Sequence, residues 1–213
     1  MKKDFLPTGV ILVSIIVGII AFPGLPHELP IHWSNGEPDK YTNKTLAILL
    51  IPILMLISNF LALFFLKTKQ VNGNYDNMTI LNKINMVMLS LLFVIHLVII
   101  AFGLGFEFNI HFLIGALLGL FIIIVANFMQ KTKPNYAYGL RTPWTLKDER
   151  VWKQANRFGA KMFVVIGFLI IGLSFVIPQY ITIVIIGLLL GGVLIAVYAS
   201  YLIYKKLNTD SDQ

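Results

Sequence analysis

The sequence predicts an all-α integral membrane protein with six transmembrane helices and with both termini in the cytoplasm. Three observations support this: an apolar composition, six long apolar stretches, and a one-sided distribution of lysine and arginine. Of 213 residues, 57% are hydrophobic and 13% are charged, whereas a soluble domain usually carries about 25% charged residues. Too few polar groups remain to cover a water-facing surface, so we expect a multi-pass protein of the cell membrane.

Six stretches approach the length of about 20 apolar residues that crosses a bilayer. Each must be helical, because backbone amides in hydrocarbon find no water to bond. The stretches are Phe5–Phe22, Thr45–Leu66, Ile84–Leu104, Ile110–Met129, Met162–Ile177 and Ile181–Ile203. We interpret the first as a retained helix rather than a signal peptide, because its apolar run is long and no small-residue cleavage site follows.

The positive charges determine the expected orientation. Of the 17 lysine and arginine residues, only Lys40 and Lys44 lie in the connection after the first stretch, which leaves fifteen on the other side. This asymmetry places the larger group in the cytoplasm and requires an even number of crossings. The net charge of +7 therefore indicates topology and contact with anionic lipids. It does not indicate nucleic-acid binding, for which we would expect a soluble basic module.

The outward connection Pro23–Lys44 is predicted to form a compact lid of extended and turn structure. Its four prolines exclude a regular helix, and Asn35-Gly36 is a turn dipeptide. The lid offers polar and aromatic side chains for contact with an external ligand: His27, His32, Trp33, Glu37 and Asp39. Imidazole and carboxylate groups suit zinc, but Pro30 prevents a helix that would place both histidines on one face. A solvated polar lid is therefore the favoured interpretation over a metal site.

The inward connection Gln130–Lys161 is the most informative part of the chain. Pro134 and Gly139 keep its first half irregular, and Thr142 or Thr145 can then cap a helix. From Leu146 the pattern is amphipathic, so we expect an interfacial helix that turns into the fifth span. Its charged face carries Arg150, Lys153, Arg157 and Lys161, and its apolar contacts are Val151, Trp152, Ala155, Phe158 and Met162.

Few polar residues lie within the spans. Asn59, His96 and Asn127 are the candidates for intramembrane function, and we expect His96 to be an interhelical hydrogen-bond partner. Two GxxxG patterns, Gly115/Gly119 and Gly187/Gly191, allow close helix approach. They are weak evidence for dimerisation, because packing within one bundle uses the same motif.

The catalytic motifs that we sought are missing, and the chain has no cysteine. We therefore expect neither an enzyme nor a cofactor or bound metal. Two alternatives stay open: a small transporter or flippase-like protein, and a membrane metal hydrolase using His27, His32 and Asp39. The predicted organisation is a two-span unit at 1–66 that includes the lid (23–44), a third span at 67–109, and a region at 110–213 that contains the cytoplasmic segment 127–161.

A resemblance to a known family rests on that cytoplasmic segment. The run KPNYAYGLRTPWTLKDERVWKQANRFGAKMF is similar to the signature of the SdpI family of bacterial membrane immunity proteins. The matching positions are Asn135, Gly139, Leu140, Arg141, Thr142, Pro143, Trp144, Thr145, Leu146, Val151, Trp152, Arg157, Phe158, Gly159 and Lys161. Asn156 stands where many relatives carry histidine. The lid, through Leu25, Pro26, Leu29, Pro30, His32, Trp33, Gly36, Pro38 and Asp39, resembles a short domain that often precedes this signature.

The resemblance implies immunity to a secreted peptide toxin that meets the outer face. It also implies a receptor role, in which the protein holds a soluble transcriptional repressor at the membrane. The docking candidates for that cytoplasmic partner are Asn135, Arg141, Trp144, Arg150, Trp152 and Arg157.

Overall fold

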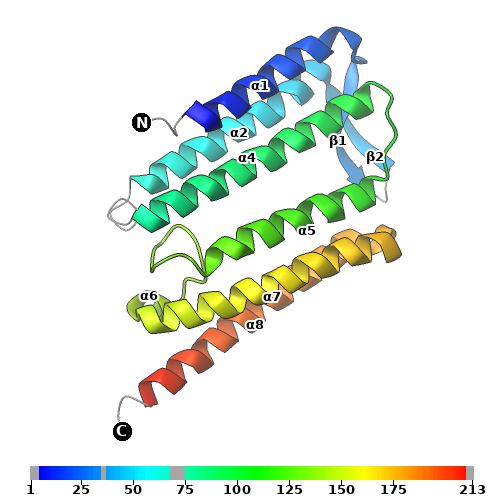
Figure 1. Cartoon of the computed structure of the whole chain (residues 1–213). Helices are drawn as coiled ribbons and strands as arrows, with labels where there is room; N and C mark the ends of the chain where they lie inside the picture. Colours follow the sequence, from blue (N-terminus) through cyan, green and yellow to red (C-terminus); the bar gives the residue numbers. More distant parts are fainter. Residues whose placement is uncertain (1–4, 35–36, 68–74, 210–213) are drawn as a thin grey trace. The chain divides into compact units, whose positions relative to one another are not determined.

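A computed structural model describes residues 5–34, 37–67 and 75–209. It has six helices that are long and apolar enough to cross a membrane, which confirms the predicted class of multi-pass, all-α membrane protein (Figure 1). These helices are α1 (Phe5–Ala21), α2 (Lys44–Leu66), α4 (Tyr75–Gly103), α5 (Ile110–Met129), α7 (Glu149–Val176) and α8 (Ile181–Thr209). A short helix, α6 (Pro143–Lys147), precedes α7. Lys2, Lys3, Lys69 and the predicted Asn35-Gly36 turn lie outside the described residues.

The amphipathic segment and the fifth span form one helix. We expected an interfacial helix that turns into the span, but α7 continues without a break from Glu149 to Val176. No proline interrupts it, and its only capped start is at Asp148, so nothing in the local sequence ends the helix where the polarity changes. The expected turn is therefore wrong, and the cationic residues lie on the first turns of the spanning helix itself. Phe158, expected among the apolar contacts, is 40% exposed.

The chain divides into two compact units. The N-terminal unit comprises Met1–Leu63 and Asn85–Ile114, and the C-terminal unit comprises Phe64–Ile84 and Gly115–Gln213. Most of α4 thus groups with α1 and α2, although the sequence suggested a separate segment for the third span. Buried apolar residues from these three helices form the core of the N-terminal unit, namely Ile11, Ala47, Ile48, Ile51, Met55, Leu89, Ile99 and Ile100, joined by Leu25 and Leu29.

The lid is a two-stranded antiparallel hairpin. Strands β1 (Glu28–Ser34) and β2 (Glu37–Asn43) pair from Glu28 opposite Asn43 to Ser34 opposite Glu37. An irregularity lies between Pro30 and His32, which is where a proline that cannot donate a ladder hydrogen bond is tolerated.

In the C-terminal unit, α5 and α7 approach each other through glycine. A Cβ atom added at Gly119 would lie 2.7 Å from the carbonyl oxygen of Gly167, and one added at Gly167 would lie 2.7 Å from the carbonyl oxygen of Gly119. Only residues without side chains fit at this crossing. The first GxxxG pattern therefore packs within the bundle. Gly187 and Gly191 of the second pattern have nothing within 4 Å of an added Cβ.

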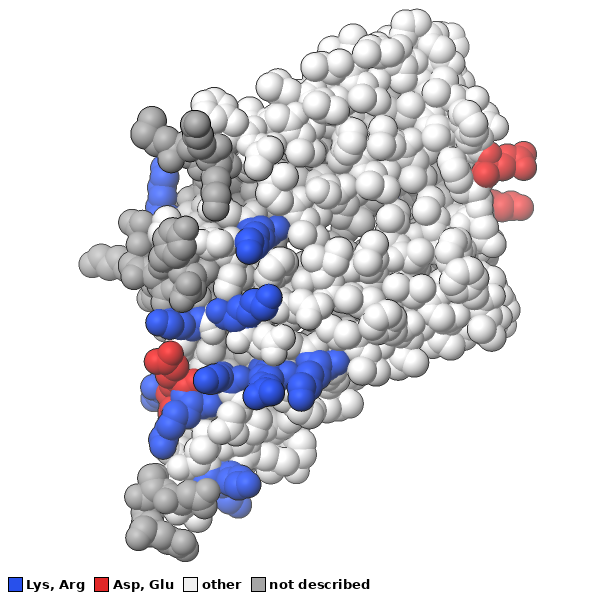
Figure 2. Space-filling view, in the orientation of Figure 1, with Lys and Arg blue, Asp and Glu red and all other residues white. Residues whose placement is uncertain are grey.

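Positive charge gathers at one end of the C-terminal unit. The space-filling view shows lysine and arginine at the end of the unit where α5 ends and α7 begins, and the middle of the bundle is free of them (Figure 2). Lys205 and Lys206, in the last turns of α8, belong to the same end. This distribution is what the positive-inside rule uses, and the cytoplasmic assignment of this end stays a prediction.

Candidate functional site

The connection between α5 and α7 is a folded structure built on side-chain hydrogen bonds. Asn135 is 2% exposed, and its Oδ1 accepts from the backbone N–H groups of Ala137 and Tyr138, at 2.9 Å each. The Asn135 side chain also donates to the Lys133 carbonyl at 2.8 Å. Such bonds give an Asx turn that fixes the backbone without secondary structure. Asn77 of α4 holds Lys133 in turn, through bonds to both its backbone groups.

The second half of the connection packs on α7 through Asn156. Gly139 has a φ of +113° and lies so close that an added Cβ would be 2.7 Å from Asn156 Oδ1 and 2.9 Å from Trp152. Glycine is required on both counts. Asn156, fully buried, accepts from the Leu140 N–H at 2.7 Å and donates to the Trp152 carbonyl at 3.0 Å. The Trp152 indole donates to the Thr132 carbonyl at 2.7 Å.

The two helices that follow have classical N-caps. Thr142 and Thr145 form a reciprocal capping box at the start of α6, with Pro143 in its first turn. Thr142 is therefore the cap that the sequence left open between two threonines. Asp148 caps α7 and accepts from the backbone N–H of Arg150 at 2.7 Å. A second bond, from the Arg150 guanidinium at 3.0 Å, lowers the pKa of Asp148 below its ordinary 3.8.

Tyr138 and Trp144 attach this connection to the helices. The Tyr138 hydroxyl donates to the Val125 carbonyl of α5 at 2.5 Å, and its burial raises the pKa of the phenol. The Trp144 indole donates to Ser200 Oγ of α8 at 2.9 Å and lies edge-on to Tyr201, with ring centroids 5.6 Å apart. The connection is thereby held by α4, α5, α7 and α8.

These positions change the expected docking surface. Asn135 and Trp152 are buried to 2% and 1% exposure, so neither can touch a soluble partner, and both hold the fold instead. Trp144 is half-buried on α8. Arg141, Arg150 and Arg157 are exposed, and they are the candidates that remain available.

The hairpin separates a packed side from a polar side. Leu25 and Leu29 are buried against Gly103 of α4, and Trp33 contacts Phe102 edge-on with ring centroids 5.9 Å apart. Lys44, expected in the outward loop, starts α2, and its ammonium donates to the carbonyls of Phe22 and Leu25 at 3.2 and 3.1 Å. It therefore closes the base of the hairpin.

Four of the five predicted contact residues are exposed: His32, Glu37 and Asp39 on the hairpin, and His27 immediately before β1. His32 Nδ1 lies 2.6 Å from Asp39 Oδ1, and this hydrogen bond lowers the pKa of the Asp39 carboxyl. In the described part of the chain no three residues of the types His, Cys, Asp and Glu are grouped as a metal site would need. His27 thus does not join the His32–Asp39 pair to complete the triad of the metal-hydrolase alternative.

Two of the three candidate polar residues within the spans bond across helices. His96 is 1% exposed, and its Nδ1 lies 2.7 Å from Ser14 Oγ of α1, which confirms the predicted interhelical hydrogen bond. Asn59 of α2 accepts from Asn85 of α4 at 2.9 Å. Asn127 donates only to the Ile123 carbonyl of its own helix, at 2.8 Å, and is exposed.

Sequence reasoning missed several partners, above all Ser14, Asn85, Asn156 and Ser200. All four are buried. Ser14, Asn85 and Ser200 are polar residues inside apolar stretches, a pattern that marks either a hydrogen-bond partner or a functional group, and interpreting every serine and asparagine of the spans in this way would have found them. Asn156 lies in the amphipathic start of α7, where a polar residue gives no such signal. Thr132 and Asn77 gave no such signal, because they lie near helix ends.

Comparisons with known proteins place the chain in a family. The immunity protein SdpI of Bacillus subtilis (strain 168) is 41% identical over 208 residues, covering 98% of this chain and 99% of that protein. The chain belongs to the SdpI family. The SdpI/YfhL family model matches residues 131–203, and a domain of unknown function, DUF1648, matches residues 9–56.

A second relative is shorter. The uncharacterized protein YfhL of Bacillus subtilis (strain 168) is 33% identical over 57 residues, which is 25% of this chain and 52% of that protein. No solved structure matches the chain. The family match begins at Lys131 and runs into α8, so it contains the hydrogen-bonded connection, while the DUF1648 match contains the hairpin.

Proposed function

We propose that this protein is a membrane immunity protein that gives its cell resistance to a secreted toxic peptide. The observation that carries this proposal is the 41% identity to an immunity protein over nearly the full chain. The exposed polar side of the hairpin supports it, on the expectation that this hairpin faces outward. The toxin contacts are His27, His32, Glu37 and Asp39, which are exposed. Trp33 supports them by packing on Phe102.

Expression in a toxin-sensitive cell tests the proposal. The full-length chain should raise the toxin concentration that stops growth. A variant with His27→Ala and Glu37→Ala, neither of which has a packing role, should lose most of that protection at unchanged membrane abundance. The matched control is Lys205→Ala with Lys206→Ala, in the last turns of α8. Protection equal to wild type in the hairpin variant would remove the hairpin from the contact.

We further propose that the exposed cationic row on α7 docks a soluble repressor protein at the inner face. Arg150, Lys153 and Arg157 recur at helical spacing and are exposed. A ligand bound at the outer face can change docking only if it binds two arrangements of the bundle unequally. Such a row of exposed cations is complementary to an acidic protein surface. Charge complementarity raises the association rate and fixes the register of the bound partner.

Recruitment of a fluorescent repressor to the membrane tests this second part. Arg150→Ala with Arg157→Ala should abolish recruitment and leave toxin resistance intact, and Lys205→Ala with Lys206→Ala is again the control. Recruitment that survives in the α7 variant would show that the partner docks elsewhere. The transporter alternative is less well supported, because Asn59, Asn85, Ser14 and His96 are paired across helices.

A further inference from the structure

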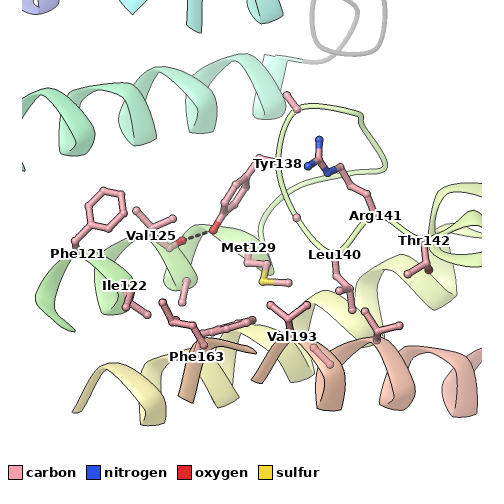
Figure 3. A pocket seen from close by; sticks show the side chains of 16 residues that line it. Phe121, Ile122, Val125, Met129, Tyr138, Leu140, Arg141, Thr142, Phe163 and Val193 are labelled. Carbon is pink, nitrogen blue, oxygen red and sulfur yellow. Dashed lines mark hydrogen bonds between the residues drawn. The ribbon is translucent and has the colours of Figure 1, made fainter. Parts of the chain in front are cut away.

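The C-terminal unit contains a pocket of about 560 Å³. Its walls come from α5, from residues 137–142 of the connection, from α7 and from α8 (Figure 3). That volume lies within the range of small-molecule sites, about 300–1,000 Å³. The pocket lies on neither of the surfaces proposed above, so its role is a separate question.

The lining is apolar except for three residues of the connection, and two of those are already satisfied. The Tyr138 hydroxyl is bonded to the Val125 carbonyl, and Thr142 is used in the capping box. Arg141 donates one bond, to the carbonyl of Tyr136, although a guanidinium carries five N–H donors. In the described part of the chain the ion pairs are His32–Asp39 and Arg150–Asp148, so Arg141 has no carboxylate there. Arg141 is therefore a cation at the edge of an apolar pocket, with no carboxylate partner among the described residues.

The pocket is also polarised along the helices. Figure 3 shows Phe121 and Ile122 at one end, with Arg141 and Thr142 at the other. From Phe121 to Met129, α5 rises about 12 Å. The apolar end therefore lies within the span and the cationic end at its boundary. Val193 of α8 lines the pocket and is still 47% exposed, so the pocket is open on the lipid-facing side of α8.

We propose that this pocket binds one phospholipid with an anionic head group. An acyl chain lies between α5 and α8, and the phosphate bonds to the free N–H donors of Arg141. Arginine binds phosphate through two parallel bonds. An anionic head group is favoured over a zwitterionic one because it carries no choline cation for the guanidinium and the neighbouring cations to repel. The ligand belongs to the leaflet at the basic end of the unit, where anionic lipid is attracted to the surrounding cations.

Photocrosslinking of the full-length protein in lipid nanodiscs tests the proposal. Phosphatidylcholine nanodiscs receive a trace of phosphatidylglycerol or of phosphatidylcholine, each with a diazirine near the end of one acyl chain. Adducts should concentrate on the peptide that carries Phe121–Met129 and on the facing part of α8. The adduct yield should be at least tenfold higher with labelled phosphatidylglycerol than with labelled phosphatidylcholine. Unlabelled phosphatidylglycerol should compete for the site.

Two pairs of variants locate the site. Val193→Trp covers the opening and should lower the yield of the α5 adduct at least tenfold. Leu194 is 71% exposed and lies outside the pocket, so Leu194→Trp should not lower that yield. Arg141→Gln should remove the preference for the anionic lipid, whereas Arg150→Gln should keep it. The Arg141 pair adds no bulk, so it remains informative if Val193→Trp does not fold.

Three results would overturn the proposal. The exposed residues Ile183 and Phe168 lie outside the pocket. If they form adducts in the same yield as the pocket residues, with no head-group preference, the labelled lipid is boundary lipid alone. Competition by free glycerol phosphate would mean a site for a soluble anion. No adduct in the pocket with either lipid would mean that the pocket binds no phospholipid.

Discussion

Replacing Gly119 with alanine should destabilise the bundle, although alanine is the better helix former. The added methyl group would lie 2.6 Å from a side-chain carbon of Ile171 and 2.7 Å from the Gly167 carbonyl oxygen. Ile171 can adjust, but the backbone oxygen moves only if α5 and α7 separate. Overpacking of this kind costs about 1–3 kcal/mol.

The matched control is Gly187→Ala on α8, which belongs to the same kind of GxxxG pattern but has nothing within 4 Å of an added Cβ. Each substitution gains the helix-propensity difference between alanine and glycine, about 0.8–1 kcal/mol. This gain cancels when the two variants are compared, so their difference in free energy of unfolding should equal the overpacking cost, about 1–3 kcal/mol.

Equilibrium unfolding in mixed micelles of dodecyl maltoside and dodecyl sulfate, followed by far-UV circular dichroism, measures this difference. Gly187→Ala should unfold at or above the dodecyl sulfate fraction that unfolds the wild type, and Gly119→Ala should unfold clearly below Gly187→Ala. Equal midpoints for the two variants would refute the close crossing of α5 and α7.

The remaining predictions concern hydrogen bonds. Ser14→Ala should lower the free energy of unfolding by about 1–3 kcal/mol in the same assay, because it removes the bond that His96 Nδ1 makes in a buried site. Asp148→Ala should cost about 1 kcal/mol through the lost cap of α7. The pKa of Asp148 is lowered by its bond with arginine, so the charged cap is complete above pH 3.8 and is lost as pH falls through the lower folded value; the midpoint in dodecyl sulfate should shift only in that acidic window. The Asp39 carboxyl should titrate below 3.8 by NMR, and His32→Ala should move its midpoint upward.

The spans could be predicted because the bilayer imposes their length, while the hairpin could not. Hydrocarbon forces each apolar run of about 20 residues into a helix, and Ile110–Met129 agrees with the structure at both ends. In the lid, the prolines excluded a helix and the sequence predicted extended and turn structure, but it did not predict that two strands pair. Both strands of a two-stranded hairpin are edge strands, however, and edge strands accept proline where a central strand does not. Pro30 and Pro38 are therefore compatible with β1 and β2.

Within the candidate site, the motif residues were visible in the sequence but their roles were not. Asn135 and Trp152 were docking candidates because they belong to the family signature on the predicted cytoplasmic segment. Their actual partners are backbone groups of the connection itself and the Thr132 carbonyl. The Asn135 bonds form a local turn, which helical periodicity does not reveal, and the bond from Trp152 reaches a residue far back in the sequence. The Asn156 position was recognised only as a departure from relatives, and the bond to the Leu140 N–H explains why an acceptor is needed there.

Of the six docking candidates, three hold the fold and three are exposed arginines. The surroundings of these arginines indicate different roles. Arg141 borders an apolar pocket, Arg150 is bonded to the Asp148 cap, and Arg157 is exposed and takes part in no ion pair of the described residues. If Arg141 binds lipid and Arg157 binds a protein partner, the two functions involve no shared contact. Effects of non-neighbouring substitutions add when they share no partner. Arg141→Gln combined with Arg157→Ala should therefore lose lipid preference and recruitment each to the extent of the single variants; a larger combined loss would mean that the pocket and the cationic row act on the same bundle arrangement.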